Sequence, residues 1–76
     1  MPKLPRVTGA RMVAALQRDG FFFVRQRGSH LVLHHAGRSR TVSVPVHAGR
    51  TLALGVTHAI LDQAGLTVEE FIRLLT

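Results

Sequence analysis

Three short runs that alternate apolar and polar residues fill the middle of this chain, and the links between them are short enough for hairpins. The runs cover residues 21–26, 29–35 and 41–46. The first link is Arg27-Gly28, and the second is residues 36–39. Alternation with a period of two is typical of strands, and parallel neighbours would need a crossover of about a dozen residues or more. The pattern therefore predicts a three-stranded antiparallel sheet.

Helical patterns flank this predicted sheet. Thr8 is a good N-cap for a first helix that ends at Asp19-Gly20, where the glycine can adopt a positive φ. A second helix begins after residue 51 and closes at Ala64-Gly65. Its predicted apolar face carries Val56, Ala59, Ile60 and Gln63.

The C-terminal segment predicts a short extra helix. Thr67 and Glu70 have the spacing of a capping box, in which each residue caps the backbone N–H of the other. The complete order is helix, three strands, helix and short helix, which is an α+β fold. Residues 1–76 are expected to form a single domain, with residues 1–7 as an extended arm that carries two prolines.

Threading both hairpins assigns the side chains to two faces of the sheet. If Arg27-Gly28 is a two-residue turn, Arg25 lies opposite His30, and the second loop pairs Leu33 with Val42. One face is then apolar and packs against the helices: Phe22, Val24, Leu31, Leu33, Val42 and Val44. The other face stays open and carries Phe21, Phe23, Arg25, His30, Val32, His34, Thr41 and Ser43.

The charge balance indicates a polyanionic partner. Ten Lys and Arg residues face four Asp and Glu residues, for a formal net charge of +6, and Lys3 is the only lysine. The guanidinium group of arginine binds phosphate through two parallel hydrogen bonds, so this composition favours nucleic acid. The sequence contains no cysteine and no apolar run near the roughly 20 residues that span a bilayer. We expect a cytoplasmic protein with no membrane partner.

Histidine pairs in this sequence do not predict a metal site. His34 and His35 are adjacent on one predicted strand, so their side chains point to opposite faces. His30 and His34 share a face but lie about 13 Å apart along a strand, too far to bind one ion. We expect neither a metal nor a cofactor.

An ordered set of short motifs resembles the HicA toxin family. These motifs are Gly20-Phe21, residues 24–30 with the sequence VRQRGSH, residues 44–47 with VPVH, and residues 60–66 with ILDQAGL. The resemblance implies a fold like that of double-stranded-RNA-binding domains. It further implies an mRNA interferase that is neutralised by a HicB antitoxin encoded beside it. The catalytic histidine of this family follows Gly-Ser, which makes it His30 here.

Histidine and arginine at this position suit the cleavage of RNA. A base that removes the 2′-OH proton lets that oxygen attack the adjacent phosphorus without a metal, and histidine exchanges protons near neutral pH. His30 is therefore the predicted catalytic residue, and Arg25 and Arg27 are predicted to bind the scissile phosphate. The remaining candidates for RNA binding are Gly28, Ser29, His47, Arg38, Arg40 and Lys3.

Two other functions are compatible with the sequence. One is a non-catalytic RNA-binding module of the same fold, which recognises the shape of A-form RNA and its 2′-hydroxyl groups. The other is an interaction protein whose basic face binds only an acidic, antitoxin-like partner. For the toxin, we expect a HicB-like antitoxin to cover the open sheet face together with His30.

Overall fold

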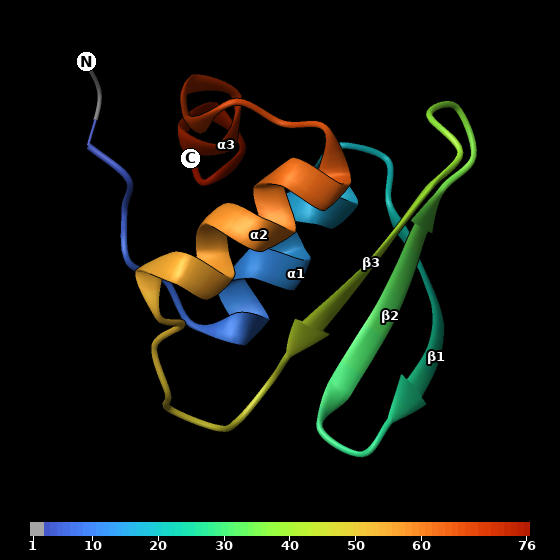
Figure 1. The fold of residues 1–76 in the computed structure, drawn as a ribbon, viewed down its shortest axis with the longest axis horizontal. Helices are drawn as coiled ribbons and strands as arrows, with labels where there is room; N and C mark the ends of the chain where they lie inside the picture. The colour runs from blue at the N-terminus through green and yellow to red at the C-terminus, as the bar shows by residue number, and fades with distance from the viewer. Residues whose placement is uncertain (1–2) are drawn as a thin grey trace.

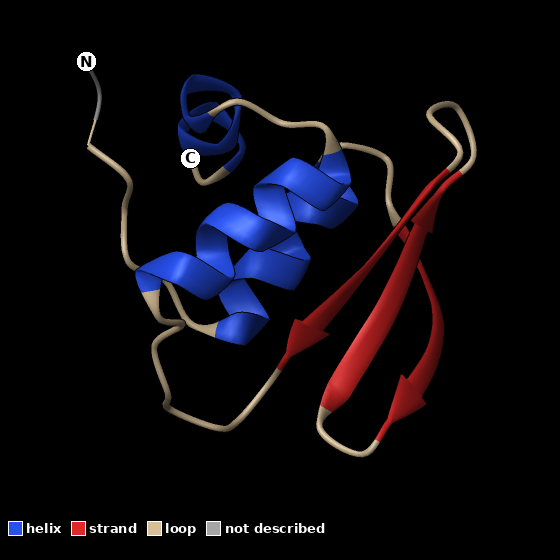
Figure 2. Ribbon diagram, in the orientation of Figure 1, coloured by secondary structure: helices blue, strands red, loops and turns tan. Residues whose placement is uncertain are grey.

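The computed structural model describes residues 3–76, and a single sheet and three helices form its framework (Figures 1 and 2). The sheet is antiparallel with the strand order β1-β2-β3. Helices α1 and α2 pack on the β3 side of the sheet, and α3 contacts α1. The predicted α+β fold is therefore confirmed, with the layout of a double-stranded-RNA-binding domain. The elements are α1 (Gly9–Arg18), β1 (Phe22–Arg27), β2 (His30–His35), β3 (Arg40–Pro45), α2 (Leu54–Ala64) and α3 (Val68–Leu74).

Local hydrogen bonds set the ends of the helices, as predicted. The Thr8 side chain accepts a hydrogen bond from the backbone N–H of Arg11 at 3.2 Å and caps α1. Gly65 ends α2 with a φ of +76°, in the left-handed region. Thr67 and Glu70 form the complete capping box of α3. Within residues 3–76, no helix is both long enough and apolar enough to cross a membrane.

The predicted N-terminal arm is described only in part, because residues 1–2 lie outside the described residues. Residues 3–7 contain no helix or strand. Val7 is nevertheless buried, and its carbonyl accepts a hydrogen bond from the N–H of Leu52 at 2.8 Å. This contact ties the start of α1 to the segment that precedes α2.

The second hairpin has the predicted register, whereas the first does not. Leu33 pairs with Val42 across the loop of residues 36–39. In the first hairpin, the turn is Gly28-Ser29 instead of Arg27-Gly28. Gly28 has a φ of +58° and stands first in the turn, as in type II′ turns. Because the turn lies one residue later than predicted, each β1 residue up to the bulge pairs two residues further along β2. Our prediction that Arg25 lies opposite His30 is therefore wrong.

A bulge in β1 overturns the predicted faces of its aromatic residues. The pairing shifts between Phe23 and Arg25, so Val24 is an extra residue on β1. Phe22 was predicted in the core but packs edge-on against His34 on the opposite face, with ring centroids 5.7 Å apart. Phe21 was predicted on the open face but is buried at the end of the core. The bulge shifts the alternation by one residue, which exchanges the two faces.

The buried face of α2 also differs from the predicted one. Val56 is 39% exposed, and only Ile60 of the predicted stripe is buried. Thr57 is buried in this stripe instead, and its hydroxyl donates to the backbone carbonyl of Ala53 at 3.1 Å, so its polar group is satisfied. The buried residues of α2 are Thr57, Ile60, Leu61 and Ala64.

The hydrophobic core lies between the helices and the two strands β2 and β3. Its largest fully buried side chains are Phe71, Met12 and Leu16 from the helices, with Leu33, Val42 and Val44 from the sheet. All six residues of β1 are exposed. The strand that carries the two predicted phosphate-binding arginines is thus outside the core and free to contact a ligand.

Candidate functional site

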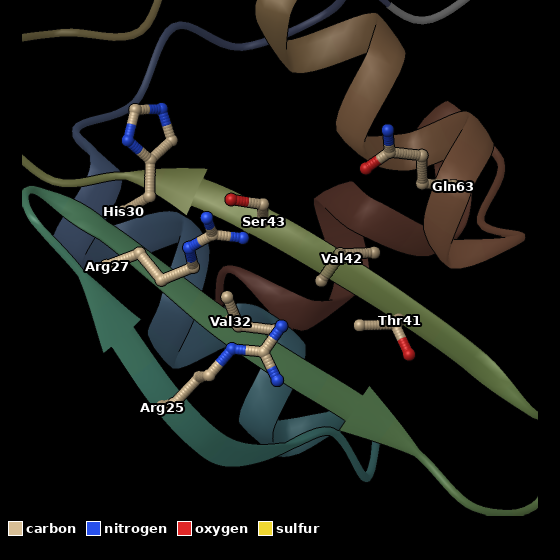
Figure 3. A pocket seen from close by; sticks show the side chains of 8 residues that line it. All are labelled: Arg25, Arg27, His30, Val32, Thr41, Val42, Ser43 and Gln63. Carbon is tan, nitrogen blue, oxygen red and sulfur yellow. The ribbon is translucent and has the colours of Figure 1, made fainter.

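A hollow of about 540 Å³ lies where residues of all three strands and of α2 meet. Figure 3 shows the side chains around it. The lining residues are Arg25, Arg27, His30, Val32, Thr41, Val42, Ser43 and Gln63. Three residues predicted as site residues, His30, Arg25 and Arg27, are therefore brought together by the fold.

The strand register positions these basic groups. Arg27 is paired with His30 across the first hairpin, and Arg25 is paired with Val32 two positions further along. Because alternate residues of a strand point to the same face, the two arginines and His30 share one face. In Figure 3 the two arginine side chains extend over this face beside Val32 and Ser43. His30 is exposed, as predicted.

The lining of the hollow suits an anionic, polar ligand. None of the described residues that line it is acidic, and three are arginine or histidine. Val32 is only 6% exposed and forms an apolar part of the surface. The Ser43 hydroxyl and the Gln63 amide offer polar groups for hydrogen bonding. This combination of fixed positive charge and directional polar groups can hold a phosphate and the sugar or base attached to it.

The turn before His30 is held in place by the segment that follows β3. The Ser29 hydroxyl and His47 Nε2 form a hydrogen bond of 3.3 Å. The backbone N–H of Val46 donates to the Ser29 carbonyl at 2.8 Å, and the Gln26 side chain donates to the Gly28 carbonyl at 2.9 Å. These contacts join Gly28, Ser29 and His47 at one end of the sheet.

His47 also faces a second, smaller cleft. This cleft has a volume of about 190 Å³ and includes Arg50, so it is basic as well. Its other lining residues come from the segment between β3 and α2 and from the first turn of α2. They are Pro45, Thr51, Leu52, Ala53 and Val56.

Three further candidates for RNA binding, Arg38, Arg40 and Lys3, do not line the hollow. Arg38 forms a salt bridge with Asp19, and its second guanidinium hydrogen bond to that carboxylate is 3.1 Å long. Arg40 donates to the backbone carbonyls of Asp62 and Gln63, at 3.3 and 3.2 Å, at the end of α2. Lys3 is in the N-terminal segment, which runs on the other side of the helices from the strands (Figure 1).

The hydrogen bonds of Arg38 have an electrostatic consequence. The hydrogen bond to Asp19 is the largest influence on the Arg38 guanidinium and raises its pKa, although partial desolvation opposes this effect. Arg38 therefore stays charged and joins the loop of residues 36–39 to the end of α1.

The adjacent histidines have structural partners. His34 Nδ1 is hydrogen-bonded to the Thr41 hydroxyl at 2.9 Å. His35 Nδ1 accepts from the backbone N–H of Arg38, and its Nε2 lies 3.0 Å from the Asp19 carbonyl oxygen. Across residues 3–76, no group of three or more histidine, cysteine or acidic residues could hold a metal ion.

We did not predict from the sequence that Ser43 and Gln63 line the hollow. Gln63 was predicted on the core face of α2, and Ser43 was predicted only as an open-face residue of the sheet. The signal for Ser43 was present, because it pairs with Val32 in the register that the second hairpin predicts. Gln63 gave no such signal, since its position depends on how α2 is rotated against β3.

Comparison with known families adds one match to this geometry. The family described as the HicA toxin of bacterial toxin–antitoxin systems matches residues 9–66. The matched segment begins with the first residue of α1 and contains the whole sheet and every residue that lines the hollow. No curated protein matches the chain. Because the family match covers most of the sequence, this protein is a member of the HicA family, the toxins of bacterial toxin–antitoxin systems.

Proposed function

We propose that this toxin is a metal-independent endoribonuclease that cleaves mRNA and thereby inhibits translation. The observation that carries this proposal is the convergence of His30, Arg25 and Arg27 on one exposed, basic hollow. Family membership supports the toxic role. The site residues and the reaction are inferred from the chemistry of these side chains together with the resemblance of residues 24–30 to the family motif.

The proposed reaction uses the nucleophile that RNA itself carries. His30 removes the proton from a 2′-OH group, and the 2′ oxygen attacks the adjacent phosphorus. The bond from phosphorus to the 5′ oxygen then breaks, and that oxygen takes up a proton as it leaves. The expected products are a 2′,3′-cyclic phosphate and a 5′-hydroxyl end. A histidine within hydrogen-bond reach of the 2′-OH is suited to this proton transfer near neutral pH.

The arginines supply the electrostatic part of the mechanism. Negative charge grows on the non-bridging oxygens as the phosphorus is attacked, and fixed guanidinium groups stabilise that charge. Arg27 is the direct cross-strand neighbour of His30, so one nucleotide can contact both. Arg25 lies further along the same face and is placed for the next phosphate. Gly28, Ser29 and His47 hold the turn and contact the RNA beside the scissile bond.

The other predicted contacts have a minor place in this proposal. Arg38 and Arg40 make hydrogen bonds that join elements of the fold, and Lys3 belongs to the N-terminal segment. Any contact that these three residues make with RNA would be with the phosphate backbone, without choice of sequence.

The decisive experiment compares three proteins on one labelled mRNA in excess EDTA. These are the wild type, His30→Ala and His58→Ala, the last being a control on the exposed surface of α2. We expect cleavage by the wild type and the control only, with RNA binding retained by all three. Equal cleavage by His30→Ala would refute the role of His30. RNA binding without cleavage by any protein would favour the non-catalytic RNA-binding module.

We further propose that a HicB-like antitoxin neutralises the toxin by covering the sheet face that carries His30. Covering this face would block the histidine and both arginines at once. The purified complex should therefore lose cleavage of the same mRNA. A complex that cleaved at the rate of the free toxin would contradict this arrangement.

A further inference from the structure

The outer edge of β1 is an unprotected apolar surface on a very basic chain. Strand β1 lies at the edge of the sheet and, among residues 3–76, pairs only with β2. Phe22, Phe23 and Val24 are 50%, 50% and 45% exposed, and they are consecutive. An edge strand presents free backbone N–H and C=O groups, and an exposed apolar edge favours pairing with another strand. This edge therefore has the properties of an interface.

The two faces of β1 distinguish a strand partner from RNA. Phe22 packs against His34 on the face of the hollow, whereas Phe23 pairs with Leu33, whose side chain faces the core. The two rings are therefore on opposite faces at the edge. Stacked bases need aromatic rings on one face, as in the sheets that bind single strands. An added β-strand contacts both faces, because its own side chains alternate.

Charge distinguishes an acidic partner from a second copy of this chain. Arg25 and Arg27 follow the apolar residues on the same strand, and the chain has a net charge of +6. Two copies of this chain would each bring a net charge of +6 to a shared interface, and like net charges oppose association. A strand that combines apolar with acidic side chains fits both parts of β1.

We propose that the free edge of β1 is the docking site for an acidic β-strand of the antitoxin, which extends the sheet to four strands. The proposal rests on membership in the toxin–antitoxin family and is independent of the RNA-cleaving mechanism. A strand paired with β1 places its acidic side chains beside Arg25 and Arg27. The same contact that binds the partner thus neutralises the basic residues of the hollow.

The test measures the affinity of the toxin for the purified antitoxin encoded beside it. All proteins carry His30→Ala so that the toxin can be produced. The test variant is the double substitution Phe22→Ser and Phe23→Ser. The matched control is Leu54→Ser and Val56→Ser, since these α2 residues are 42% and 39% exposed. Thermal unfolding checks that both variants keep the fold, which we expect because all four side chains are exposed.

We expect the β1 variant to raise the dissociation constant at least about 50-fold, and the control to change it less than about threefold. The first value corresponds to burial of roughly 100 Å² of exposed ring at the usual coefficient for apolar area. Binding of the antitoxin should slow hydrogen exchange at those β1 amides that are not bonded to β2. Protection of these amides is specific to the addition of a strand.

Four results would overturn the proposal. The first is antitoxin binding by the β1 variant that is as tight as binding by the control. The second is weakened RNA binding with unchanged antitoxin affinity, which would assign the patch to RNA. The third is a complex in which no β1 amide gains protection. The fourth is a toxin that dimerises through β1 on its own.

Discussion

The contact between the first turn of α1 and the end of β3 leads to a sharp prediction at Gly9. Gly9 is the first residue of α1 and is buried. A Cβ atom there would overlap the carbonyl oxygen of Pro45 and lie 3.0 Å from the Cα atom of Val46. Both are backbone atoms, so no side-chain rotation can relieve the overlap. We therefore expect Gly9→Ala to push α1 away from the end of β3.

The magnitude follows from the cost of overpacking. Extra methyl groups in well-packed interiors destabilise by about 1–3 kcal/mol, and a backbone contact belongs at the upper end of that range. Alanine regains less than about 1 kcal/mol of helix propensity at a terminal position. The net loss should be about 2 kcal/mol, which lowers the midpoint of thermal unfolding by roughly 8–16 °C in a domain of this size.

Gly55 provides the matched control for this experiment. It lies in the first turn of α2, and a Cβ atom there would meet nothing within 4 Å. Gly55→Ala should therefore raise stability by about 0.5 kcal/mol, because alanine reduces the freedom of the unfolded chain. Urea unfolding of both variants in the His30→Ala background gives the comparison. If Gly9→Ala stabilised the protein as Gly55→Ala does, the close packing of α1 on β3 would be refuted.

The Gly9 substitution should also reach the functional site. Pro45 is the cross-strand partner of His30, and the next residue donates a backbone hydrogen bond to Ser29. Displacement of the end of β3 therefore moves the turn that carries His30. We expect Gly9→Ala to weaken RNA binding, measured at a temperature where the variant is still folded, while Gly55→Ala leaves RNA binding unchanged.

Three further predictions concern the N-terminal cap of α3, the pH dependence of stability and the RNA affinity of Arg38 variants. Thr67→Ala should cost about 1 kcal/mol in urea unfolding, since it removes the side-chain cap of α3; an unchanged midpoint would argue against the capping box. Hydrogen bonds from the Thr67 backbone and side chain lower the pKa of Glu70. Ionised Glu70 therefore stabilises the folded protein at neutral pH, and this contribution is lost as the pH falls through the lowered pKa. The stability difference between the wild type and Glu70→Gln should therefore shrink on acidification, and a difference independent of pH would contradict this assignment. Arg38→Ala should leave RNA affinity nearly unchanged, because Arg38 binds Asp19, whereas Arg27→Ala should weaken it about tenfold or more; equal losses in a filter-binding assay would place Arg38 in the RNA interface.

Much of the fold and part of the site could be predicted because the relevant contacts are local. The cap at Thr8, the capping box from Thr67 to Glu70 and the second hairpin each depend on residues a few positions apart. Interactions of this range depend mainly on residue type and spacing. The order of the elements follows from them, and so does the antiparallel sheet.

The structure brings His30, Arg25 and Arg27 to one hollow even though the predicted register of the first hairpin was wrong. The true turn shifts the partner of Arg25 from His30 to Val32, a change of two residues. Because side chains alternate with a period of two, such a shift leaves Arg25 on the same face as His30. The bulge at Val24 instead shifts β1 by one residue, and the predicted faces of Phe22 and Phe23 failed for that reason.

The sequence by itself therefore determined the elements, their order and the face shared by His30 and the β1 arginines, since these depend on period and on nearby hydrogen bonds. Only the tertiary structure decided which other polar groups join the site and which, such as Arg40, bond to another part of the fold instead. The bond between Ser29 and His47 spans 18 residues, and the contacts of Arg40 with the end of α2 span 22 and 23. Such contacts depend on how α1 and α2 pack against the sheet. That packing is set by the combined burial of side chains from distant segments, which no local pattern encodes.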